Sequence, residues 1–242
     1  MQKLIVLSFI LLFSCKNKPE IKVTVQKTVD TLQNVTQTTE VEKDTLQLED
    51  FFVDSLNIGK KSFNKIELSK YRIADSGYVL IKFYSKQNRN WILKSEYNFE
   101  NNNVTGLNTE LSDFNNDELN DMTYISAMGA RGANELRRLF IYDRQKDQLI
   151  CIKNFDEYPN ILYNKELNCL DAFLVYGGCS TVFLKISGDS LKEFASVQLS
   201  DGLTIRRYDK NGREKIVFQD STNKAGYIRY KNFKPLKEYD EY

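Results

Sequence analysis

The residues with the clearest chemical potential lie in the segment "DFNNDELND". Counted from Asp113, side-chain oxygens fall at positions 1, 3, 5 and 9, and a backbone carbonyl at position 7 would add one more. Calcium takes six to eight oxygen ligands at short range, and alternate residues of a tight loop can supply them. The spacing therefore predicts a calcium site whose ligands are Asp113, Asn115, Asp117, Asp121 and the carbonyl of Leu119.

A solvated acidic turn is the alternative interpretation, since Asp and Asn favour turns in any case. Tyr124 stands at position 12, where an EF-hand has a bidentate glutamate, so a helix–loop–helix site is excluded. Glu118 stands where such loops usually have a glycine for a turn at positive φ. The apolar residues Leu111, Phe114 and Leu119 interrupt the acids, which favours a loop that packs against the domain.

A glycine-rich segment with a basic residue follows the acidic loop. A strand from Met122 to Met128 would lead directly into it, so a bound cation would fix the position at which the segment begins. Glycines let a backbone turn sharply and come close to a partner. We expect Arg131 at the tip of this loop. The predicted partner-binding residues are Ser126, Gly129, Arg131, Gly132 and Asn134.

The composition excludes several classes of function. The charges of the 34 basic and 33 acidic residues nearly cancel, so the net charge does not indicate a nucleic-acid partner. Histidine is absent, which removes Ser-His-Asp and Cys-His nucleophiles and histidine-based zinc sites. The acids at 113, 117 and 121 have the spacing of ligands and no accompanying nucleophile. We therefore expect a protein that is not an enzyme.

The chain begins with the sequence of an exported protein. Residues 1–15 combine Lys3 with an apolar run too short to span a bilayer, and they end in a lipobox-like Leu-Phe-Ser-Cys. Cys15 is then the lipidated residue, and the alternative is an ordinary signal peptide with an incidental cysteine. Residues 16–45 contain no aromatic residue and are expected to form a flexible tether. These features predict a location in the cell envelope, with lipid anchoring to a membrane.

Residues 46–242 are expected to form a single all-β domain. About a dozen short strands with tight turns favour an antiparallel sandwich, a barrel or an irregular propeller-like sheet. Alternation in "WILKSEYNF" predicts that Trp91, Leu93, Tyr97 and Phe99 share one face. The pair Asn211-Gly212 favours a type I′ hairpin turn.

Three cysteines remain in this domain, Cys151, Cys169 and Cys179. A tight hairpin at Gly177-Gly178 would place Cys179 opposite Tyr176, beyond the reach of Cys169. A disulfide between Cys151 and Cys169 and a set of three free thiols are then the two alternatives.

Four segments occur in an order that resembles a known protein family: "DFNNDELND", "SAMGARGANE", "LFIYD" and "FLVYGGCSTVFLKISGDSLKEF". The family comprises calcium-loop envelope proteins of Gram-negative bacteria that are similar to periplasmic type I lysozyme inhibitors, and it includes immunity proteins. The resemblance implies that the loop after the strand plugs a muramidase cleft, with Ser126, Gly129 and Gly132 at matching positions. Residues 134–136 stand where the family has a tyrosine, which puts the partner in doubt.

Paired carboxylates in such a cleft could meet Arg131 or the pair Arg137-Arg138, unless the pair is a solvated strand end. The alternative function is a non-inhibitory envelope assembly protein or a polysaccharide-binding lipoprotein. The tyrosines of "YRIADSGY" and "EYDEY" are its only support.

Overall fold

The structure is a computed structural model that describes residues 46–101, 105–223 and 226–240. The expected signal peptide (1–15) and tether (16–45) lie outside these residues. Within them the chain forms sixteen strands and two short 3₁₀ segments, and every strand pairing is antiparallel. The all-β prediction is confirmed.

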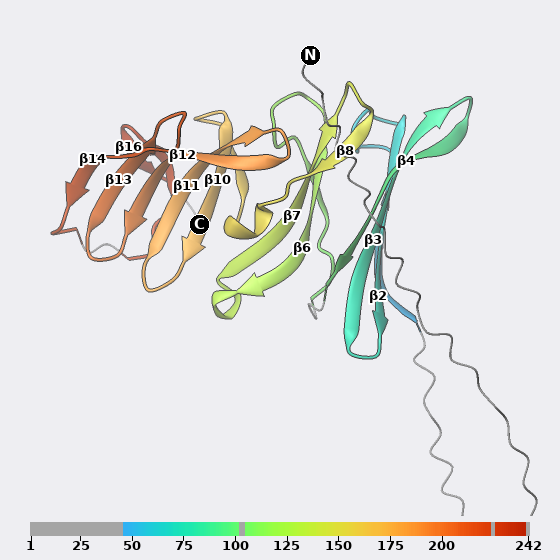
Figure 1. Cartoon of the computed structure of the whole chain (residues 1–242), viewed down its shortest axis with the longest axis horizontal. Coiled ribbons are helices and arrows are strands. Elements are labelled where there is room, and N and C mark those ends of the chain that lie inside the picture. Colours follow the sequence, from blue (N-terminus) through green and yellow to red (C-terminus); the bar gives the residue numbers. More distant parts are fainter. Residues whose placement is uncertain (1–45, 102–104, 224–225, 241–242) are drawn as a thin grey trace, which may run out of the picture. The chain divides into compact units, whose positions relative to one another are not determined.

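The strands belong to four sheets, and in each sheet neighbouring strands follow chain order (Figure 1). The first sheet contains β1 (Gln47–Asp54), β2 (Asn64–Ile73), β3 (Ser76–Gln87) and β4 (Asn90–Glu100). The second contains β5 (Glu110–Ser112), β6 (Asp121–Gly129), β7 (Asn134–Asp143) and β8 (Gln148–Cys151). The third contains β9 (Leu162–Asn164), β10 (Cys169–Val175), β11 (Cys179–Ser187), β12 (Ser190–Leu199), β13 (Leu203–Tyr208) and β14 (Glu214–Asp220). A hairpin of β15 (Tyr230–Phe233) and β16 (Leu236–Glu238) completes the set, and the 3₁₀ segments are η1 (Ala130–Gly132) and η2 (Phe155–Glu157).

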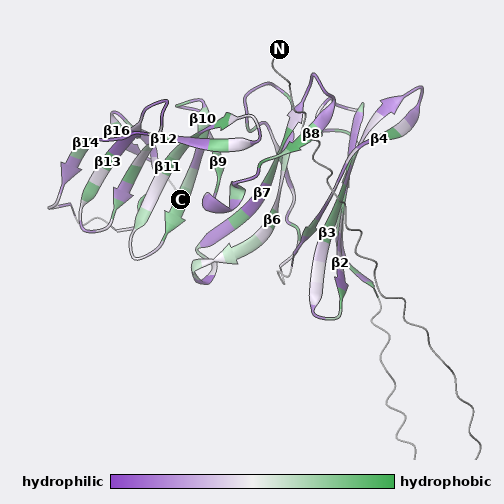
Figure 2. Ribbon diagram, viewed as in Figure 1, coloured by the Kyte–Doolittle hydropathy of each residue, from purple (hydrophilic) through white to green (hydrophobic). Residues whose placement is uncertain are grey.

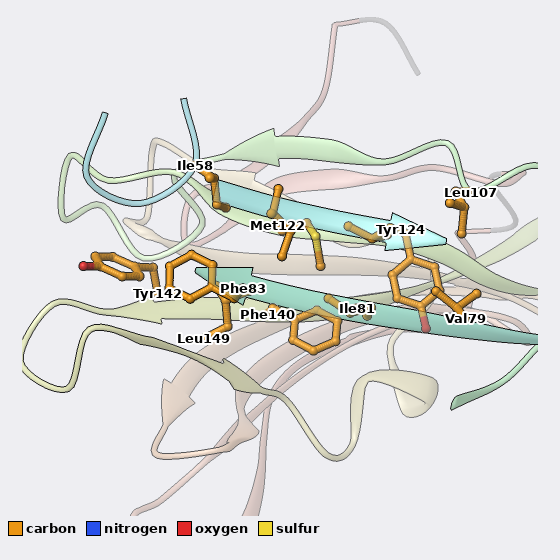
Figure 3. Packing of buried hydrophobic residues seen from close by; sticks show 12 residues of the cluster. Ile58, Val79, Ile81, Phe83, Leu107, Met122, Tyr124, Phe140, Tyr142 and Leu149 are labelled. Carbon is orange, nitrogen blue, oxygen red and sulfur yellow. The ribbon is translucent and has the colours of Figure 1, made fainter. Parts of the chain in front are cut away.

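The four sheets are open and pack face to face as an irregular sandwich, and among the described strands none closes into a barrel. Strands β2, β3 and β13 alternate buried and less buried residues, as half-buried strands do, and hydrophobic and hydrophilic residues both occur along the strands (Figure 2). The inner faces of the first and second sheets share one core. In this core the rings of Phe83 and Tyr142 are neighbours, with their centroids 5.7 Å apart (Figure 3).

Strand β7 is buried on both of its faces. Phe140 and Tyr142 pack into the core shared with the first sheet, whereas Leu139 and Ile141 pack into a second core shared with the third sheet. A strand covered on both sides reads as a continuous apolar run, which is why "LFIY" lacks the usual alternation. The second sheet is therefore the middle layer, and the acidic loop and the glycine-rich segment both belong to it.

A β-bulge overturns the prediction that four apolar residues of β4 share one face. Phe83 pairs with Ser95 but Tyr84 pairs with Leu93, which leaves Lys94 as an extra residue. An extra residue reverses the side-chain alternation beyond it. Tyr97 and Phe99 consequently pack against the first core, whereas Leu93 is 47% exposed and Trp91 lies with it on the outer face.

Two expectations about turns are also wrong in detail. Cys179 pairs with Val175 rather than Tyr176, because the turn contains three residues. All three cysteines of the domain are free, which is the second of the two alternatives for these thiols. At Asn211-Gly212 only the glycine has positive φ, at 76°, so the turn is not type I′. Its shape is set by the Asp209 carboxylate, which accepts hydrogen bonds from the N–H groups of Asn211 and Arg213.

Candidate functional site: an acidic loop and a hairpin tip

The acidic loop connects β5 to β6, and the pair Ser112 and Asp121 closes it. Phe114 is only 3% exposed and belongs to the second core, while Leu111 and Leu119 pack against the first. The loop is thus anchored on both faces of the middle sheet, as its apolar residues suggested.

Asp121 is fully buried at the start of β6. Its Oδ2 accepts a hydrogen bond from the N–H of Phe114 at 2.9 Å, and its Oδ1 accepts one from the N–H of Tyr142 at 2.8 Å. Burial, together with the charges of Asp117 and Asp113, raises the pKa of this carboxyl to about 7, although the two backbone hydrogen bonds lower it. A buried, crowded carboxyl of this kind is ionised at lower cost when a cation lies beside it.

The other acids of the loop are held by the loop's own backbone. Asp113 accepts hydrogen bonds from the N–H groups of Asp117 at 3.1 Å and Glu118 at 2.8 Å. Asn115 accepts a second bond from Asp117 N–H, and Asp117 accepts one from Leu119 N–H at 3.0 Å. Among the described residues, no three acidic or cysteine side chains converge closely enough to hold a metal ion. Coordination by all three aspartates would therefore require them to move toward a common point.

The loop has a left-handed residue at position 6, where calcium loops usually have a glycine. Asn116 and Glu118 both have positive φ, at 60° and 67°. Asn tolerates the left-handed region, whereas a glutamate there costs roughly 1–2 kcal/mol. Glu118 therefore occupies a glycine position under strain.

The glycine-rich segment forms the tip of the β6–β7 hairpin. Ala130, Arg131 and Gly132 have φ values of 46°, 56° and 97°, so three consecutive residues are left-handed. Arg131 is exposed, and among the described residues its side chain forms no hydrogen bond or ion pair. Gly129 has a φ of −116°, which any residue can adopt, so its glycine is not required by the backbone.

Two asparagines fix the base of this tip to β10. The Asn134 side chain donates to the Val175 carbonyl and accepts from the Val175 N–H, both at 2.9 Å. The Asn160 amide donates to the carbonyls of Ala133 and Phe173, each at 2.8 Å. Asn134, predicted to contact a partner, is thus engaged within the protein. Asn160 was missed by sequence reasoning, although the preceding Pro159 marks a turn.

The remaining predicted residues are distributed along the same hairpin. Ser126 lies at a bulge in β6, and its hydroxyl donates to the Leu136 carbonyl at 3.0 Å. Arg137 is engaged by Glu135, Thr123 and the carbonyl of Asn108. Arg138 lies between two aromatic rings. The alternative that Arg137 and Arg138 form a solvated strand end is therefore wrong.

The acidic loop and the tip occupy opposite ends of β6. Asp121 begins the strand and Gly129 ends it, a separation of about 26 Å at 3.3 Å per residue. The five predicted metal ligands belong to one loop, in which the three aspartates do not converge on a common point, and Gly129, Arg131 and Gly132 lie together at the tip. The structure does not join the two groups in one site.

No family model and no curated protein matches the sequence. Among solved structures, the chain is similar to a Xanthomonas protein described as related to the type IV secretion system. The two chains share 10% sequence identity with a TM-score of 0.46, over 72% of this chain and 97% of the other. A likeness of this degree does not identify a family, an activity or a partner. Within the described residues, no helix has the length and apolarity needed to cross a membrane.

Proposed function

We propose that the protein is a non-enzymatic binding or inhibitor protein of the cell envelope, which engages a protein partner through the tip of the β6–β7 hairpin. One observation carries the proposal. Arg131 is exposed at a left-handed tip whose base is fixed by Asn134 and Asn160. A rigid base beneath an unpaired, exposed cation lowers the entropy lost on binding.

The partner we propose is a lysozyme-like muramidase. The clefts of such enzymes hold a pair of carboxylates, and a guanidinium can bind a carboxylate by two parallel charge-assisted hydrogen bonds. Arg131 is better suited to this role than Arg137, whose guanidinium already binds Glu135 and Thr123. The other support is the resemblance of the segments around the tip to those of lysozyme inhibitors.

Calcium is proposed as the ligand of the acidic loop. The donors that would hold it are Asp113, Asn115, Asp117, Asp121 and the Leu119 carbonyl, and oxygen donors alone suit a hard cation. The buried, crowded carboxyl of Asp121 supports the assignment. Its role would be structural, because the loop packs into both cores of the middle sheet.

Anchoring is proposed through a lipid on Cys15, which lies outside the described residues. Two or three acyl chains, at about 0.8 kcal/mol per CH₂, would hold the protein firmly on a membrane. Cys15→Ala should then move it from the membrane fraction to the soluble fraction. Unchanged fractionation of that variant would contradict the lipid anchor without bearing on the hairpin tip.

The test of the main proposal is residual lysis of cell-wall material by muramidases of several classes in the presence of increasing amounts of the protein. We expect inhibition of at least one class at micromolar protein. No inhibition of any class would refute the inhibitor function. The immobilised protein would then be incubated with envelope extract to search for another partner.

A second candidate function, polysaccharide binding, is supported by the outer face of the first sheet. The rings of Tyr71 and Tyr78 are stacked there with centroids 5.4 Å apart, and Lys65 lies 4.2 Å from the ring centre of Tyr84. Flat aromatic surfaces beside polar groups suit the apolar faces and hydroxyls of sugars. Retention on insoluble cell-wall polysaccharide that Tyr71→Ala abolishes would favour this function over muramidase inhibition.

A further inference from the structure

A groove with a volume of about 780 Å³ lies between β4, β8 and the turn from β11 to β12. Tyr97, Phe99 and Leu149 contribute apolar surface to it, Lys146 and Lys153 line it, and Arg138 reaches it from β7. It involves neither the acidic loop nor the hairpin tip.

The guanidinium of Arg138 lies between two aromatic rings. Its central carbon is 3.7 Å from the ring centre of Phe99 and 4.2 Å from that of Phe155. Such stacking holds a guanidinium in a fixed plane. The orientation of this arginine is thus set before any ligand arrives.

No acidic side chain neutralises Arg138. Among the described residues it forms no ion pair, and its buried Nε has no hydrogen-bond partner. The Tyr124 hydroxyl and the Cys151 thiol interact with its guanidinium. Burial raises the pKa of Tyr124 to about 12 and raises the pKa of Cys151, against the opposing effect of the Arg138 charge. Both groups are therefore uncharged at neutral pH, and neither can act as the counter-ion.

The two lysines of the groove, in contrast, are each matched by an acid. Lys153 binds Asp189 at 2.7 Å, and Lys146 lies 3.7 Å from Asp143. Arg138 is therefore the one unmatched charge among the residues that line the groove. A partly buried charge without a partner is costly, and a bound anion would remove that cost.

We propose that this groove binds a small organic anion, a carboxylate with an apolar body. Arg138 would bind the carboxylate through parallel hydrogen bonds, and Tyr97, Phe99 and Leu149 would contact the apolar part. The arrangement matches the general pattern of ligand sites, in which apolar walls surround a few fixed polar groups. The stacked arginine supplies the fixed polar group here.

Calorimetric titration of the full-length chain tests the proposal, with decanoate as the probe at concentrations below those that form micelles. We expect decanoate to bind with one-to-one stoichiometry. Decanol, which lacks the charge, and acetate, which lacks the apolar body, should each bind at least tenfold more weakly. Equal affinity for decanoate and decanol would overturn the proposal, because Arg138 would then contribute nothing.

Two arginine variants test whether decanoate binds at Arg138. Arg138→Met keeps the length of the side chain and removes its charge, so affinity for decanoate should fall at least tenfold. Arg137→Met removes the neighbouring charge, which binds Glu135 instead, and should leave affinity unchanged. Retained affinity in Arg138→Met would contradict the assignment.

A measurement on the unmodified protein covers the case in which Arg138→Met does not fold. Cys151 lines the groove and is half-buried, whereas Cys169 and Cys179 are buried. Bound decanoate should slow alkylation of Cys151 by iodoacetamide at least threefold, as followed by mass spectrometry of its peptide. Unchanged alkylation at saturating decanoate would place the ligand elsewhere.

Discussion

The backbone N–H of Tyr142 donates a hydrogen bond of 2.8 Å to the carboxylate of Asp121. This bond joins the last residue of the acidic loop to β7, an inner strand of the middle sheet, 21 residues further along the chain. Tyr142 in turn packs against Phe83 of the first sheet. The state of the loop is thereby linked to the packing of the first core.

Asp121→Asn should destabilise the fold by about 1–3 kcal/mol, measured as the free energy of unfolding in urea. The two oxygens of Asp121 each accept a backbone N–H, from Tyr142 and Phe114. An asparagine turns one acceptor into a donor and leaves one buried N–H without a partner. In the control, Asp143→Asn, a single oxygen accepts both backbone bonds, so the loss should stay below about 0.5 kcal/mol. Equal losses in the two variants would contradict this role for Asp121.

Calcium should raise the melting temperature by a few degrees. Extracellular calcium modules bind with Kd on the order of 10⁻⁴ to 10⁻³ M, and calcium at tenfold above Kd stabilises by about 1.4 kcal/mol. The difference between calcium and chelator should vanish in Asp113→Ala and in Asp117→Ala, whatever their own stability. Superimposable melting curves of the unmodified protein with calcium and with chelator would show that the segment is only an acidic turn.

Glu118→Gly should stabilise the protein by about 0.5–1 kcal/mol. Glycine relieves the left-handed strain at φ 67°, and the greater freedom of the unfolded chain offsets part of the gain. Glu118→Ala removes the same exposed carboxylate but keeps the Cβ, so it should give no comparable gain. If the alanine variant is stabilised as much as the glycine variant, charge rather than strain is the cause.

The sequence predicted the strands of the domain well because most of them obey a local rule. Alternation and flanking turns are encoded in neighbouring residues, as in β2 and β13, where buried and less buried residues alternate. The outward placement of Trp91 and Leu93 was not predictable in this way. It follows from a bulge at Lys94, which is defined by pairing with β3 rather than by the residues of β4 themselves.

In the candidate site, too, the sequence predicted local features but not contacts between distant residues. The spacing of the acidic residues and the position of Arg131 at the tip are local properties, and Arg131 does lie at the tip as predicted. The attachment of the tip to β10 depends on Asn134 and Asn160, whose partners lie 41 and 13 residues away. The stacking of Arg138 on Phe99 and Phe155 likewise joins three elements that only the fold brings together.

Two adjacent glycines in the turn after β10 should differ in their tolerance of alanine. A Cβ at Gly178 would lie 2.3 Å from the carbonyl oxygen of Leu199, whereas a Cβ at Gly177 would meet no atom within 4 Å. Gly178→Ala should therefore cost about 1–3 kcal/mol of unfolding free energy, and Gly177→Ala should be nearly neutral. Chemical denaturation of the two variants is the measurement, and similar midpoints would contradict the close approach of β12.

Arg131→Ala should weaken binding to the muramidase by about 1–3 kcal/mol, the cost of losing a charge-assisted hydrogen bond at an interface. Its melting temperature should stay within about a degree of the parent, because the side chain is exposed and alanine carries the same left-handed cost as arginine. Arg131→Lys keeps the charge but not the planar pair of donors, so its affinity should fall between those of the parent and the alanine variant.

Asn134→Ala distinguishes a residue that supports the hairpin tip from one that contacts the partner. The change leaves the N–H and carbonyl of Val175 without their partner, so we expect both a lower melting temperature and weaker binding as the base of the tip loosens. Arg131→Ala should weaken binding alone. Binding isotherms and melting curves of the two variants distinguish these patterns. If Arg131→Ala binds the muramidase as tightly as the parent, the hairpin tip does not make the contact, and the partner must bind another face of the molecule.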